Sequence, residues 1–169
     1  MSASPKPQPA GGAGRYLTFS LGNESYGFPV LKVREIIRLC PITPVPRMPT
    51  YVKGVINLRG TVIPVFDLRA KFQFGITSCG DRSCIIVVQV ARLPGENTLI
   101  GTIVDAVQEV IHLAAADIEA APDFGGAPDT QCILGLATIE GSVKTLLNVE
   151  KIFLEDGSFS LTSTQKPEV

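Results

Sequence analysis

An internal repeat constrains the fold of this chain more strongly than any other feature of its sequence. Residues 26–39, YGFPVLKVREIIRL, align with residues 100–113, IGTIVDAVQEVIHL. A second pair of segments follows in the same order, with VKGVINLRGTVIPVFDLRAKF at 52–72 over ILGLATIEGSVKTLLNVEKIF at 133–153. The chain is therefore predicted to contain two related halves. The identical pairs are Gly27/Gly101, Val30/Val104, Val33/Val107, Glu35/Glu109, Ile37/Ile111, Leu39/Leu113, Gly54/Gly135, Gly60/Gly141, Val62/Val143 and Phe72/Phe153.

The local patterns inside the halves, residues 15–80 and 81–156, are mostly those of β-strands. YLTFSL, at 16–21, alternates apolar and polar side chains, as a strand with one buried face does. SCIIVVQV at 83–90 and NTLIGTIV at 97–104 are rich in β-branched residues and are joined by the turn-forming RLPGEN. Short strands bent at glycines favour small closed barrels. The predicted fold is mostly β, with two small barrels packed together.

Two segments have the apolar spacing of helices instead. In VLKVREIIRL, at 30–39, the apolar residues Val30, Val33, Ile36 and Ile37 share one helical face. LNVEKIFL, at 147–154, has a similar pattern. The sequence therefore predicts one short helix in the first half and another near the C-terminus.

The ends of the chain differ in composition from this body. Residues 1–14 contain three prolines and a Gly-Gly-Ala-Gly run, and residues 157–169 are polar. Such segments bury too little apolar surface to order themselves, so both are expected to be flexible tails around one domain at 15–156. The start lacks the apolar core of a secretory signal, and no apolar run approaches the roughly 18 residues of a membrane helix. We therefore expect a cytoplasmic protein.

Charge and residue types argue against several classes of function. Fifteen basic and sixteen acidic residues give a net charge of -1, and the chain has three Tyr and no Trp. Phosphate neutralisation and base stacking are poorly supplied, so an RNA-binding barrel is a remote alternative. No phosphate loop, dinucleotide fingerprint or nucleophile-elbow motif follows any predicted strand. The chain is predicted to bind no cofactor and to be no enzyme, although long-range contacts could still assemble an active site.

The cysteines and the single histidine do not have the spacing of a metal site. Cys79 and Cys84 form the one closely spaced pair, and His112 takes the place that Arg38 has in the first half. We expect His112 to be exposed. We expect the thiols to be reduced, since no export signal is present. The four cysteines are Cys40, Cys79, Cys84 and Cys132.

The segment YVKGVINLRGTVIPVFDLR, at 51–69, separates shared architecture from what is specific to the first half. Gly54, Gly60 and the apolar run at 62–68 have equivalents in the second half, which indicates a structural role. Three polar positions have no such equivalent and are either solvated surface or part of a binding site. They are Lys53, Asn57 and Arg59, which face Leu134, Thr138 and Glu140 in the alignment.

Together with ITPVPRMPT before it and the segments at 16–38, 85–90 and 100–113, this stretch resembles the CheW-type chemotaxis coupling proteins. The resemblance implies two five-stranded SH3-like barrels and a non-catalytic adaptor. Such an adaptor joins the cytoplasmic tips of methyl-accepting chemotaxis receptors to the regulatory domain of a CheA-type sensor histidine kinase. It works in arrays that could include further copies of the coupling protein, and it reaches the membrane only through receptors. A coupling protein of another chemosensory pathway, such as pilus-driven motility, is the alternative.

The resemblance also implies which residues bind. Ile42 and Val45 are expected to contact the kinase, through a largely apolar interface. Glu35 and Arg59 have opposite charges, so they either meet complementary charges on a receptor helix or pair with each other. Pro29 departs from the family pattern and puts the hydrogen bonding of its strand in doubt. The expected receptor-binding residues are Val33, Glu35, Asn57, Leu58 and Arg59, supported by the motif glycines Gly54 and Gly60.

Overall fold

The computed structural model describes residues 12–72, 80–93, 96–120 and 132–154. Within them the chain forms ten strands in two five-stranded sheets, together with short helices. The predictions for most of the two tails and for Cys79 lie outside the described residues. The strands are β1 (Gly14–Leu21), β2 (Glu24–Pro29), β3 (Val33–Arg38), β4 (Val52–Leu58), β5 (Thr61–Asp67), β6 (Cys84–Leu93), β7 (Glu96–Val104), β8 (Ala106–Leu113), β9 (Ile133–Ile139) and β10 (Ser142–Leu147). The helices are α1 (Leu68–Lys71), α2 (Val149–Leu154) and the 3-10 turns η1 (Val30–Lys32) and η2 (Ala115–Asp117).

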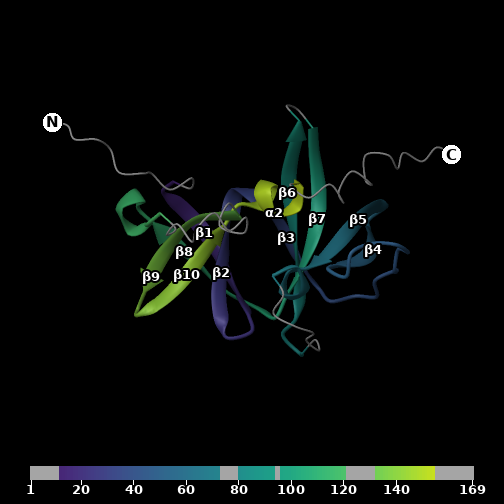
Figure 1. Ribbon diagram of the computed structural model, residues 1–169, viewed down its shortest axis with the longest axis horizontal. Helices are drawn as coiled ribbons and strands as arrows, with labels where there is room; N and C mark the ends of the chain where they lie inside the picture. Colours follow the sequence, from purple (N-terminus) through teal and green to yellow (C-terminus); the bar gives the residue numbers. More distant parts are fainter. Residues whose placement is uncertain (1–11, 73–79, 94–95, 121–131, 155–169) are drawn as a thin grey trace.

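Each sheet takes strands from both halves of the sequence. The strand orders are β8-β1-β2-β10-β9 and β3-β6-β7-β5-β4, and the two groups lie side by side with α2 between them (Figure 1). The repeat matches β2 with β7, β3 with β8, β4 with β9 and β5 with β10, so the two orders become the same when equivalent strands are exchanged. The halves at 15–80 and 81–156 are thus sequence repeats, and neither builds a sheet alone.

An isolated bridge closes each sheet into a barrel. Beyond the edge strand β3, Thr43 and Val55 of the opposite edge strand exchange two backbone hydrogen bonds of 2.9 Å. Beyond the edge strand β8, Glu119 and Leu136 do the same at 2.8 Å. Because closure removes exposed edges, both sheets gain the protection of small barrels. We name them barrel A (β1, β2, β8, β9 and β10) and barrel B (β3 to β7), and the predicted two-barrel fold is confirmed.

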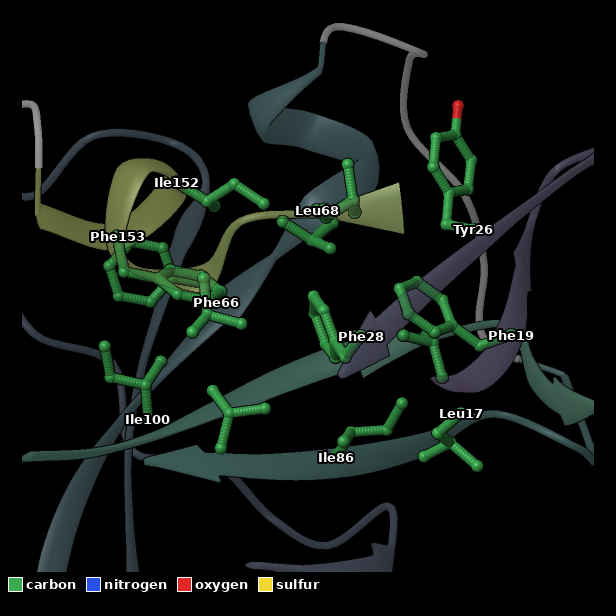
Figure 2. Packing of buried hydrophobic residues seen from close by; sticks show 14 of the residues in the cluster. Leu17, Phe19, Tyr26, Phe28, Phe66, Leu68, Ile86, Ile100, Ile152 and Phe153 are labelled. Atoms are coloured by element: carbon green, nitrogen blue, oxygen red, sulfur yellow. The ribbon is translucent and has the colours of Figure 1, made fainter. Parts of the chain in front are cut away.

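The largest hydrophobic cluster lies between the barrels rather than inside either one. The tilted rings of Phe19 and Phe28 in barrel A lie 4.7 Å apart between centroids, and Phe66 of barrel B meets Phe153 of α2 edge-on at 4.9 Å (Figure 2). A smaller cluster fills each barrel. The barrels therefore share one core, and each contributes to the stability of the other.

The strand predicted at 16–21 has two buried faces instead of one. Tyr16 packs in the cluster of barrel A, whereas Leu17 and Phe19 pack in the shared cluster. Thr18 is also fully buried, and its hydroxyl donates to the carbonyl of Glu109 at 2.8 Å and accepts from its amide at 3.1 Å. These bonds replace ladder bonds where the pairing of β1 with β8 shifts register. The alternation was read correctly as a strand, but the second barrel covers its apolar face, while the face of Tyr16 and Thr18 is buried inside barrel A.

The helix predicted at 30–39 is wrong apart from the single turn η1. Residues 33–38 form β3, which pairs with β6, and their burial alternates along the strand. Three of the four apolar residues that suggested a helix are β-branched and lie in this strand, so strand pairing overrode a coincidental helical spacing. Pro29 is the last residue of β2 and lies beyond the part of this strand that pairs with β10, so its missing amide donor interrupts no bond to that strand. The helix predicted near the C-terminus is confirmed as α2.

Candidate functional site: a binding surface on barrel B

The turn between β4 and β5 positions the segment that the sequence analysis singled out. Arg59 and Gly60 have φ values of 50° and 89°, the pattern of a type I′ turn, which matches the twist of a two-residue hairpin. The Asn57 Oδ1 accepts a hydrogen bond from the Gly60 amide at 2.8 Å. Glu140 and Gly141 adopt the same φ pattern, 52° and 82°, in barrel A. Both barrels therefore have a turn with the same backbone conformation, but the side chain at its first position is positive in barrel B and negative in barrel A.

Arg59 in the β4–β5 turn and Glu35 in β3 pair with each other. The Arg59 Nη2 donates to both carboxylate oxygens of Glu35, at 2.9 and 2.8 Å. The Arg59 side chain is 71% exposed and that of Glu35 is 27% exposed. An ion pair this exposed adds little stability, because water and salt screen it. Its two charges stay accessible to a partner that offers a complementary pair.

The polar residues that distinguish the first half all have partners within the chain. Asn57 supports the turn, Arg59 pairs with Glu35, and the Lys53 Nζ lies 3.8 Å from the Asp67 carboxylate. Asp67 in turn caps α1 by accepting from the amide of Arg69. Asn57 therefore has a structural role in the hairpin turn, and Lys53 has one beside the residue that caps α1.

Gly54 is required by the bridge that closes barrel B. Its φ is 144°, and a Cβ built on it would lie 2.0 Å from the carbonyl oxygen of Thr43. Thr43 forms the closing bridge with Val55, so a side chain at position 54 would push the bridge apart. Ile42 also lies against this glycine. Gly60, in contrast, has open space around it and is needed for its backbone angle.

The apolar residues that are expected to bind the receptor or the kinase are only partly exposed. Val33 is half-buried and packs against the shared cluster. Leu58 and Ile42 are half-buried and pack against the cluster of barrel B, and Val45 is half-buried as well. Each contributes a partial surface and also supports the fold, so large changes at these positions combine two effects.

Several exposed apolar side chains were not singled out from the sequence. Leu31 in η1 is 92% exposed, Val62 in β5 is 62% exposed and Ile36 in β3 is 45% exposed. Val62 lies in a strand, as its place in the architectural run at 62–68 indicated, but its side chain is exposed; Ile36 was assigned to a helical face and lies in β3 instead. Alternation along β3 could have found Ile36, because Arg34 and Arg38, two positions before and after it, lie on the same exposed face of the strand. The equivalent of Val62, Val143, is also 51% exposed, so identity between halves did not indicate burial.

The described residues offer no metal site, and one thiol is held protonated. No group of three or more His, Cys, Asp or Glu side chains in this part of the chain is placed to bind a metal ion. Burial raises the pKa of the Cys84 thiol, which keeps it in its less reactive neutral form. His112 is exposed on β8, as predicted. No described helix has the length and apolar character needed to cross a bilayer.

Known proteins share both the sequence pattern and the fold. Residues 15–156 match the family model of the CheW-like domain. The chain is 35% identical over 137 residues to the chemotaxis protein CheW of Klebsiella aerogenes, which covers 81% of this chain and 80% of that protein. It is 30% identical over 139 residues to Protein FrzA of Myxococcus xanthus, and this alignment covers 81% of this chain and 83% of that protein.

A solved structure supports the same assignment. The scaffolding protein TtCheW from Thermoanaerobacter tengcongensis has a TM-score of 0.76 and 33% identity to this chain, covering 86% of this chain and 95% of that one. The family model spans both barrels, the closing bridges and α1 and α2 up to residue 156. This chain belongs to the CheW-like family.

Proposed function

We propose that this chain is a non-catalytic adaptor that couples methyl-accepting chemotaxis receptors to a CheA-type sensor histidine kinase. The observation that carries the proposal is the match to the CheW-like domain over residues 15–156. Relatives named as chemotaxis proteins and a solved relative named as a scaffolding protein support it. Through its receptors the adaptor would be held at the membrane from the cytoplasm, in arrays that include the kinase and further copies of the coupling protein.

We assign the receptor contact to barrel B around the β4–β5 turn. The exposed Arg59 guanidinium, the exposed Asn57 and the paired Glu35 supply register and discrimination, as charged groups at an interface do. Val33 and Leu58 add apolar surface beside them. The kinase contact is assigned to the apolar segment that contains Ile42 and Val45, which follows β3 and lies next to Gly54.

The first test reverses the charge on the turn. In Arg59→Glu the new carboxylate would face Glu35, so the ion pair is lost, while the backbone angle is one that Glu140 already adopts. We expect receptor binding about tenfold weaker, the equivalent of one lost charge-assisted contact. Co-sedimentation with receptor-containing membranes measures binding, and thermal unfolding checks that the fold is kept.

The chain provides a matched control in the other barrel. Glu140→Arg makes the opposite charge change at the same backbone position, on a turn of the same type. We expect this variant to co-sediment as the wild type does. Tighter binding by Glu140→Arg, the reverse of the loss in Arg59→Glu, would show that total charge determines binding, and equal losses in both variants would show that the contact is not specific to barrel B.

A second candidate is a coupling role in a chemosensory pathway other than flagellar chemotaxis, such as pilus-driven motility. One relative, Protein FrzA, does not have the chemotaxis name that the others share. Affinity capture from the native host separates the candidates, since the captured kinase and receptors identify the pathway. Recovery of RNA, or turnover of a substrate, in place of these partners would overturn the adaptor proposal.

A further inference from the structure

Two ion pairs hold the places at which the chain passes between the barrels. Among the described strands the chain passes from barrel A to barrel B between β2 and β3, and back between β7 and β8. In the first connection the Lys32 Nζ lies 2.7 Å from the Glu150 Oε2 of α2. In the second the Asp105 Oδ2 lies 2.7 Å from the Arg69 Nη1 of α1. Each helix is therefore fastened to one connection.

Each carboxylate also accepts a hydrogen bond from a backbone amide and so joins the helix of its ion pair to the other barrel. The helix α1 follows barrel B and is joined to barrel A, and α2 follows barrel A and is joined to barrel B. The Asp105 Oδ2 accepts from Gly22, in the β1–β2 turn of barrel A, at 2.7 Å. The Glu150 Oε2 accepts from Ala91, in β6 of barrel B, at 3.0 Å. The four charged side chains are between 17% and 34% exposed, so screening by salt is reduced. We name these groups crossover clamp 1 (Gly22, Arg69 and Asp105) and crossover clamp 2 (Lys32, Ala91 and Glu150).

The two clamps have opposite polarity although they occupy equivalent places in the repeat. The alignment of 52–72 with 133–153 puts Arg69 over Glu150. The alignment of 26–39 with 100–113 puts Asp105 over Leu31, the neighbour of Lys32. Clamp 1 thus has its cation on the helix and its anion on the connection, and clamp 2 has the reverse.

We propose that this reversal selects the crossed topology over an uncrossed one in which each half forms its own barrel. In the uncrossed fold β2 would pair with β5 and β7 with β10, because the repeat makes β2 and β7 equivalent. In the observed fold β5 pairs with β7 and β10 with β2. The uncrossed pairing would place α1 beside the β2–β3 connection and α2 beside the β7–β8 connection.

The charges penalise that alternative at both helices. Arg69 would then face Lys32, and Glu150 would face Asp105, so two attractive contacts would become two repulsive ones. Like-charge contacts of this kind are a means by which sequences reject competing arrangements. Apolar packing also differs between the two folds, since Phe28 of β2 corresponds to Thr102 of β7 and Ile63 of β5 to Lys144 of β10, and the charges act in addition to it.

The test exchanges the helix charges without changing composition or net charge. Arg69→Glu with Glu150→Arg makes the crossed fold repulsive and the uncrossed fold attractive at both helices. We expect the yield of native monomer after refolding from urea to fall on the order of tenfold relative to the wild type. Proton NOEs between β2 and β10, which pair Gly27 with Leu146, report the crossed topology in the refolded protein.

A rescue and a control make the test specific. Adding Lys32→Asp and Asp105→Lys to the first variant restores attraction in the crossed fold, and we expect the yield to recover. The exchange Glu35→Arg with Arg59→Glu reverses a pair that lies within one barrel in either topology, because β3, β4 and β5 stay together. The yield of this variant should match that of the wild type. The proposal is overturned if the two-residue helix exchange refolds like the wild type, or if the four-residue variant refolds no better than the two-residue variant.

Discussion

At the scale of single residues, a buried lysine shows how the two barrels solve the same packing problem differently. Lys144 is 8% exposed, lies opposite Ala137 on the neighbouring strand, and bonds to the Ser25 Oγ at 3.3 Å. The repeat gives these two places to Ile63 and Ile56, which are paired in barrel B. The long lysine stem beside a small alanine replaces two isoleucines. The cost is the desolvation of a nearly buried lysine whose ammonium bonds to a neutral hydroxyl.

Replacing this charge with an apolar side chain of similar length should stabilise the protein. Lys144→Met keeps an unbranched stem beside Ala137 and removes the desolvation cost, so we expect a gain of about 1 kcal/mol in the free energy of unfolding. Urea denaturation followed by circular dichroism measures it. Lys144→Ala is the control and should be less stable than the wild type, because it removes the stem as well. A loss of stability in Lys144→Met would show that the bond to Ser25 outweighs desolvation.

At the scale of elements, the closing bridges determine where glycine is indispensable. The bridge of Thr43 with Val55 brings two backbones so close that position 54 has no room for a Cβ. The β4–β5 turn needs glycine for a different reason, since Gly60 has a positive φ in open space. The same motif therefore contains one glycine required by contact and one favoured by backbone angle.

The two glycines should respond differently to alanine. Gly54→Ala forces the bridge apart and should cost at least about 3 kcal/mol, whereas Gly60→Ala bears only the strain of a positive φ, about 1 kcal/mol. Thermal and urea unfolding of both variants compares the two costs, with Gly60→Ala as the control for a general loss of glycine. Equal costs would contradict the requirement for close approach at position 54.

At the scale of the whole molecule, the buried cores make stability depend on alkaline pH. Burial raises the pKa of Tyr16 in the cluster of barrel A. It also raises the pKa of Tyr26 and of Cys84, both of which contact the shared cluster, and nearby Glu24 adds to the effect at Tyr26. All three groups are neutral below these pKa values, and folding disfavours their charged forms.

The sign of the pH dependence follows from these directions. A group whose pKa is raised by folding gives its full stabilisation below its unfolded pKa and loses it as the pH rises through the folded value. The ordinary pKa values, 9.0 for the thiol and 10.0 for the phenols, place the loss above about pH 9. We expect the midpoint of urea unfolding to be unaffected by these groups between pH 7 and 8 and to fall above about pH 9. Tyr26→Phe should reduce the fall, and an unchanged slope in this variant would contradict a contribution from Tyr26.

Much of the fold and part of the site could be predicted from the sequence. The repeat, the strands at 83–90 and 97–104, and the C-terminal helix depend on local pattern, and they were predicted correctly. The structural role of Gly54 and Gly60 was also predicted correctly, whereas the binding roles assigned around them stay predictions. Local pattern could not show that Val62 is exposed, or that Arg59 pairs with Glu35, because both depend on strands that are distant in the sequence. The short helix predicted at 30–39 failed for the same reason, since pairing with β6 decided its structure.

The sequence by itself determined two related sets of strands, the turns that join them and the glycines at their bends. Only the tertiary structure decided which set of strands completes which barrel. The physical reason is that β2 and β7 are equivalent in the repeat, so each has the local pattern of a strand that can pair with β5 or with β10. The local pattern of each strand therefore does not choose between the crossed and uncrossed folds. The choice depends on contacts between distant segments, namely the shared cluster and the opposite charges at the two connections.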